Sequence, residues 1–109
     1  MNDYSIFKEI REDIETLERH MTIIKTLLME QPLGIIKMSQ QTGIPEHKIR
    51  YSLRILEHEG IIEASREGAI LTSDFLGNKD QILKAAKESS ESIENIYREL
   101  KNILESSGC

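Results

Sequence analysis

The side chains with the clearest binding chemistry lie close together, between positions 47 and 54. Arginine offers a planar fork of N–H donors that suits oxygen anions, while lysine and histidine add charge and tyrosine adds a flat ring with a hydroxyl. At about 100° per residue, most of these side chains share one side of a helix. Those that share it are His47, Arg50, Tyr51, Arg54 and, one turn further, His58, and Lys48 lies among them in the chain. The stretch therefore predicts a helix whose cationic and aromatic outer face could bind an anionic partner.

The opposite side of this predicted helix is apolar. Its positions follow the i, i+3, i+4, i+7 pattern of a helix packed on a core, and they are Ile49, Ser52, Leu53 and Leu56. Pro45 suits the start of the helix, because proline has a preset φ and leaves no amide unbonded there. Gly43 suits the turn before it, since glycine readily enters the left-handed region that ends a helix. We expect a short helix before Gly43 and a second one over about residues 45–58.

Two short β-prone runs follow, within residues 61–72, around a turn that contains Gly68. They predict a small hairpin with Arg66 near its tip. The segment Thr42-Gly43-Ile44-Pro45, the apolar stripe after it and the exit Glu57-x-x-Gly60-Ile61-Ile62 together resemble the winged helix-turn-helix family of bacterial and archaeal transcription regulators. The resemblance covers about residues 20–76. It implies a mainly α fold with a small β-hairpin wing, in the α+β class, flanked by helical arms.

This resemblance implies a DNA-binding transcription regulator whose partner is double-stranded DNA. Helix 45–58 would enter the major groove, with Arg50 and Arg54 as the strongest contacts and His47, Lys48 and Tyr51 beside them. The wing would place Arg66 on the backbone or minor groove. The family pattern also makes Lys37 and Gln41 candidates for phosphate contacts.

A protein-interaction module of the transcription or chromosome machinery is the alternative. The wing has only one arginine, with Glu67 beside it, and Tyr51 and Ile55 could be apolar anchors. The net charge of −5 also argues against DNA at first. However, residues 31–73 carry five basic and five acidic groups, and the acidic excess lies in the flanks. Because screening makes distant charges secondary, we expect weak nonspecific affinity for DNA that falls with salt.

Two helical arms are expected around the domain, at residues 1–19 and 77–109. Asp3 suits the N-cap of the first helix. The N-terminal apolar stripe comprises Phe7, Ile10, Ile14, Leu17, Met21, Ile24 and Leu28, and the C-terminal one includes Ile82, Ala86, Ser89, Ile93, Ile96, Leu100 and Ile103, widened by Leu83, Tyr97 and Leu104. Bare stripes of this kind mark an interface. They predict a homodimer joined through the arms, with packing within one chain as the open alternative.

Catalysis is not expected. His20, His47 and His58 are too scattered to share a metal ion, and the sequence has no phosphate-binding glycine loop or nucleophile–base pair. The single cysteine, Cys109, predicts a solvated terminal thiol. No residue cluster identifies a cofactor, and an effector stays undefined. With no secretion signal or membrane-spanning stretch in the sequence, we expect a cytoplasmic protein.

Overall fold

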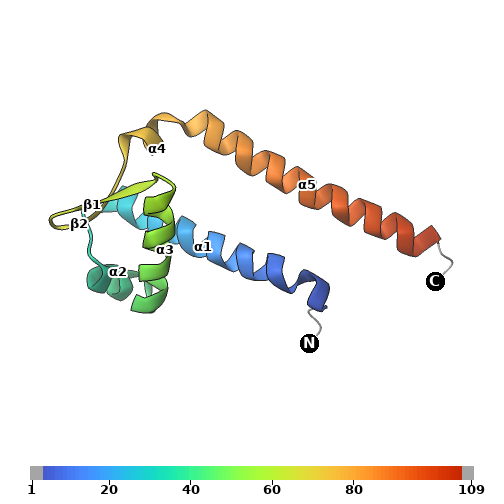
Figure 1. Cartoon of the computed structure of the whole chain (residues 1–109), viewed down its shortest axis with the longest axis horizontal. Helices are drawn as coiled ribbons and strands as arrows, with labels where there is room; N and C mark the ends of the chain where they lie inside the picture. The colour runs from blue at the N-terminus through green and yellow to red at the C-terminus, as the bar shows by residue number, and fades with distance from the viewer. Residues whose placement is uncertain (1–3, 107–109) are drawn as a thin grey trace. The chain divides into compact units, whose positions relative to one another are not determined.

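The computed structural model describes residues 4–106, which are mainly α-helical with one small antiparallel β-hairpin (Figure 1). The expected α+β class is confirmed. In chain order the elements are the 3-10 turn η1 (Ser5–Phe7), α1 (Lys8–Met29), α2 (Ile35–Thr42), α3 (Glu46–His58), β1 (Ile62–Ser65), β2 (Gly68–Leu71), α4 (Ser73–Gly77) and α5 (Lys79–Ser106). The chain divides into two compact units between Leu76 and Gly77. Asp3 and Cys109 lie outside the described residues.

The turn between α2 and α3 is the one that the sequence predicts. Gly43 ends α2 in the left-handed conformation, with φ +78°, and Pro45 is the N-cap of α3. The Ser39 hydroxyl donates to the carbonyl oxygen of Ile44 at 2.6 Å, and the Ile44 amide donates to Oγ1 of Thr42 at 3.1 Å. Side chains of α2 thus bond the backbone of the turn, which fixes the direction in which α3 leaves it.

All the longer elements of the first unit contribute to its core. The buried apolar side chains are Ile23, Ile24, Leu27, Leu33, Met38, Ile49, Leu56, Ile62, Ala69 and Leu71. On α3 the predicted inner face is confirmed, because Ile49, Ser52 and Leu56 are buried and Leu53 is half-buried. Burial of each large aliphatic side chain stabilises the fold by about 1.5–3 kcal/mol. The side chains on the opposite face of α3, from His47 to Arg54, stay exposed.

α1 carries two apolar faces, and only one of them packs in the core. The buried face comprises His20, Ile23, Ile24 and Leu27. Of the predicted stripe, only Ile24 enters the core and Ile10 is half-buried, while Phe7, Ile14, Leu17, Met21 and Leu28 are exposed. The helix runs unbroken through His20, so no boundary separates residue 19 from residue 20. An apolar stripe therefore remains uncovered along the side of the domain's own first helix.

The hairpin is held to the segment between α1 and α2. Its strands pair with Ile62 opposite Leu71 and Ser65 opposite Gly68. Leu33 forms a bridge to Ala69 through two backbone hydrogen bonds, of 3.2 and 2.8 Å. Gly68 opens β2 instead of lying in the turn, which is formed by Arg66 and Glu67. The wing is thus anchored to the domain by backbone as well as by buried side chains.

Thr72 begins the C-terminal region. Its hydroxyl accepts a hydrogen bond from the Phe75 amide at 3.1 Å, and Phe75 packs half-buried against the core. α4 ends at Gly77 and α5 follows from Lys79. At about 1.5 Å per residue, the 28 residues of α5 span about 42 Å, and all of them are exposed. No helix among the described residues is long and apolar enough to cross a membrane.

Candidate nucleic-acid interface

The predicted binding residues of α3 all lie on its exposed face. His47, Lys48, Arg50, Tyr51 and Arg54 point away from the buried side that carries Ile49, Ser52 and Leu56. Neither Arg50 nor Arg54 forms an ion pair with any other described residue. Both guanidinium groups are therefore available to a partner.

The same side chains line a shallow hollow of about 420 Å³, together with a residue from another helix. The lining residues are Arg19, His47, Lys48, Arg50, Tyr51 and Arg54. Arg19 comes from α1, and the described part of the chain contributes no carboxylate to this lining. The hollow thus combines four permanent cations with a histidine and an aromatic ring, which suits a phosphate backbone with stacked bases.

Arg19 is the one lining residue of this hollow that the sequence does not indicate. Its Nε donates to the Ser52 hydroxyl at 2.6 Å, and its guanidinium carbon lies 5.8 Å from the centre of the Tyr51 ring. This distance permits a cation–π interaction. The two contacts hold the guanidinium of α1 beside the outer face of α3. Arg19 falls on the edge of the buried face of α1, and no local pattern in the sequence indicates which helix that edge meets.

Arg50 and Arg54 also border a second hollow, between α3 and the hairpin, of about 420 Å³. Its lining is mostly apolar and includes Leu53, Ile62 and Ala69, with Glu57 as the acidic residue. The two arginines therefore stand on the ridge between a cationic hollow and an apolar one.

No protein-family model matches the chain, and no curated protein is detectably similar to it.

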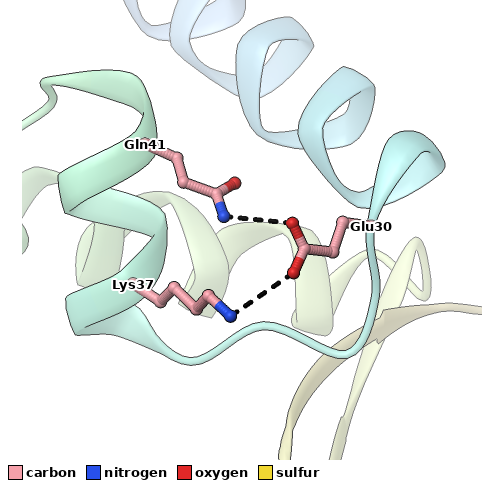
Figure 2. A network of polar contacts seen from close by, with 3 residues as sticks. All are labelled: Glu30, Lys37 and Gln41. Atoms are coloured by element: carbon pink, nitrogen blue, oxygen red, sulfur yellow. Dashed lines mark hydrogen bonds and ion pairs between the residues drawn. The ribbon is translucent and has the colours of Figure 1, made fainter.

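Lys37 and Gln41 are both bonded to Glu30 (Figure 2). The Lys37 Nζ lies 3.4 Å from Oε2 of Glu30, and the Gln41 Nε2 donates to Oε1 at 3.1 Å. The Gln41 hydrogen bond, followed by the hydrogen bond and charge of Lys37, lowers the pKa of the Glu30 carboxyl. These contacts fasten α2 to the end of α1. Neither residue lines the cationic hollow, although Lys37 and Arg50 border a third hollow beside Glu46.

Arg66 stands at the exposed tip of the hairpin and borders none of these three hollows. Its position is the one that the sequence predicts for the wing.

The other ten predicted interface residues are those of the arms. Nine are exposed and Ile10 is half-buried: Phe7, Ile10, Ile14, Leu17, Ile82, Ile93, Ile96, Tyr97, Leu100 and Ile103. Within the described residues, no group of three or more His, Cys, Asp or Glu side chains could hold a metal ion.

His20 sits behind the site, buried in the core, and its Nδ1 atom has no hydrogen-bond partner among the described residues. Burial, and then the charge of Arg19, lower the pKa of the His20 imidazole from its ordinary value of 6.5. The folded state therefore favours the neutral ring, whereas the unfolded chain takes up a proton more readily as the pH falls.

The contribution of His20 to the free energy of unfolding should consequently be fully present above pH 6.5. It should decline as the pH falls below that value toward the lowered pKa. Urea unfolding at pH 7.5, 6.5, 5.5 and 5.0 measures this dependence. A His20→Leu variant should have a shallower dependence over the same range, since His47 and His58 are exposed and stay in place. Equal slopes in the two proteins would contradict the assignment to His20.

Proposed function

We propose that this chain is a DNA-binding transcription regulator of the winged helix-turn-helix type, acting as a homodimer. The supporting observation is the hollow that Arg19, Arg50 and Arg54 share with Lys48 and His47 on the outer side of α3. α3 has 13 residues, about 20 Å of helix, and a helix with its side chains is about 10–12 Å across, which suits a major groove about 12 Å wide. Arg50 and Arg54 would read base edges, and Arg66 would lie against the backbone.

The local charge matters more than the net charge in this proposal. The net charge of −5 repels a polyanion at long range, but screening at physiological salt acts over about 8 Å. Within that range a duplex on α3 meets Arg19, Lys48, Arg50 and Arg54, while Glu57 and Glu46 border the two other hollows. Binding is thus expected to be short-ranged and strongly dependent on salt.

A fluorescence anisotropy titration tests the proposal directly. A labelled random-sequence duplex of about 30 base pairs is titrated with protein from low to physiological salt. The logarithm of affinity should fall linearly with the logarithm of salt concentration, because phosphate contacts release counterions. Absence of binding at low salt and micromolar protein would reject the proposal. Selection of bound fragments from the source genome would then identify the preferred sequence.

Replacing Arg19 by alanine should weaken binding to all duplex sequences about equally. Loss of one phosphate contact lowers the magnitude of the salt slope by about one. Lys25→Ala is the matched control, because Lys25 is also a cation of α1, is exposed and does not line the hollow. Ser52→Ala removes the hydrogen-bond partner of Arg19 and keeps the charge. If Arg19→Ala and Lys25→Ala have the same slope, Arg19 has no part in binding.

A protein-interaction module remains the second candidate. Tyr51 is 51% exposed, Ile55 is half-buried on the same helix, and the hollow between α3 and the hairpin is mostly apolar. These features suit a partner helix or peptide. The low-salt titration separates the two candidates, since an adaptor would leave the duplex unbound.

A further inference from the structure

α5 carries an apolar stripe in which large and small side chains follow a definite order. The stripe runs Ile82, Ala86, Ser89, Ile93, Ile96, Leu100 and Ile103, with Leu83, Ser90, Tyr97 and Leu104 beside it. All of these residues are exposed. The Ser89 hydroxyl donates to the carbonyl oxygen of Ala85 at 2.9 Å, within its own helix. Ser89 can therefore face an apolar partner without burying an unpaired donor.

We infer that α5 pairs with α5 of a second copy in antiparallel orientation, with the two-fold axis between residues 94 and 95. This rests on the proposed homodimer and specifies which segments form it. In this register Ile93 lies opposite Ile96 of the second copy, Ser89 opposite Leu100, and Ala86 opposite Ile103. Beside them, Ser90 meets Tyr97 and Leu83 meets Leu104. Each large side chain in the second half of α5 thus packs against a small side chain of the second copy or against an aliphatic one.

A parallel pair in register would pack the same stripe badly. Equal residues face each other in that arrangement. Ala86 would meet Ala86 and Ser89 would meet Ser89, in two successive layers. Interiors are close-packed, and gaps left by small side chains are destabilising. The sequence of side-chain sizes therefore favours the antiparallel orientation.

The charges along α5 add a weak bias toward the same orientation and register. Residues 88–94 hold three glutamates and no cation, and residues 95–101 hold Arg98 and Lys101 with Glu99. The proposed axis sets the first stretch against the second. A parallel pair, or an antiparallel pair shifted by one heptad toward the N-terminus, would set the glutamate stretch against itself. At about 100° per residue, Glu88, Glu91 and Arg98 lie on the side of α5 away from the stripe, and screening makes their contribution small. Packing therefore sets the register and supplies the attraction, and charge adds only a bias.

α1 is a poorer partner for this stripe. Residues 8–18 contain five acidic and two basic side chains, a net charge of −3, so this stretch as a whole repels the glutamates at 88–94. Equal charges at close range oppose association. The second half of α5 does provide a positive counterpart, in the form of Arg98 and Lys101. A second copy of the chain is therefore the occupant that the charges fit.

Interchain distances between spin labels test the orientation. In a Cys109→Ser background, one variant carries a nitroxide at Gln81→Cys and another at Asn95→Cys, both at exposed positions. In the antiparallel pair, the Asn95 labels should lie within about 20 Å, roughly two helix widths. The Gln81 labels should be separated by about 40 Å along the axis, at about 1.5 Å per residue. Double electron–electron resonance measures both distances.

Short distances at both sites would establish a parallel pair and overturn the inference. A Gln81 distance near 30 Å would indicate the shifted register and overturn the proposed axis. A monomer by sedimentation at the labelling concentration would overturn the pairing altogether. The same samples are titrated with duplex DNA, so that the two proposals are judged separately. If the distances between the labels are as predicted but the protein does not bind DNA, the pairing is supported and the proposed function is rejected.

Discussion

The double variant Arg50→Glu, Arg54→Glu should bind duplex DNA at least about 100-fold more weakly than the wild type at low salt. Each bidentate contact of arginine with a base is worth about 1–3 kcal/mol, and each glutamate adds repulsion from phosphate. Two such losses amount to about 2–6 kcal/mol, and the added repulsion brings the lower end toward the roughly 2.8 kcal/mol that corresponds to 100-fold. Both side chains are exposed and neither is in an ion pair with a described residue, so the fold should be unaffected.

The matched control is Lys79→Glu, Lys87→Glu, which makes the same change of net charge on α5. Its affinity should stay within a few-fold of the wild type, because α5 carries none of the residues that line the hollow. Anisotropy with the same labelled duplex measures all three proteins, and circular dichroism reports their folding. Equal affinities for the wild type and the Arg50, Arg54 variant would remove DNA contact from the outer face of α3 and favour the interaction module.

The substitution Gly68→Ala should lower the free energy of unfolding by about 2–5 kcal/mol. A Cβ atom at this position would lie 2.3 Å from the carbonyl carbon of Leu33 and 2.7 Å from the amide nitrogen of Gly34. Both contacts are with backbone, so no side chain can move aside. The φ of Gly68 is +137°, which adds strain of about 1–3 kcal/mol for any other residue. Relief requires separation of the Leu33–Ala69 bridge, with its two hydrogen bonds.

Gly77→Ala is the control for this substitution. A Cβ at Gly77 meets nothing within 4 Å, and its φ lies outside the positive range. Its unfolding midpoint in urea should therefore stay close to that of the wild type. Since small domains are stable by about 5–15 kcal/mol, the predicted loss at Gly68 is a large fraction of the total. A midpoint for Gly68→Ala equal to that of Gly77→Ala would mean that the hairpin is not held at Leu33.

The parts of the fold that the sequence predicts are those set by neighbouring residues. Gly43 and Pro45 determine a turn by their own backbone preferences, and the inner face of α3 follows from the period of its apolar residues. Pattern alone could not identify which face of α1 is buried, because that helix has two apolar faces. The choice between Met21 and Ile23 depends on the partner helix, and the structure buries Ile23.

The candidate site likewise contains residues that a local pattern predicts and contacts that depend on packing. The outer face of α3 was predictable because its five residues lie within two turns of one helix. Arg19 was not, since its contact with Ser52 joins positions 33 residues apart and depends on how α1 and α3 pack. The contacts of Glu30 with Lys37 and Gln41 also depend on packing, in this case between the end of α1 and α2. The sequence predicts Gly68 in the turn, because composition alone does not reveal the approach of Leu33.

One unbroken helix joins the uncovered apolar stripe to the hollow on α3. α1 has neither glycine nor proline between Lys8 and Met29, and it carries both the uncovered stripe at Ile14 and Leu17 and the guanidinium of Arg19 beside Tyr51. Such a helix has no residue at which it would readily bend. In the proposed regulator, a displacement of the stripe by a bound partner would reach Arg19 without a bend in the helix. The choice of partner would then be coupled to the contact with the operator.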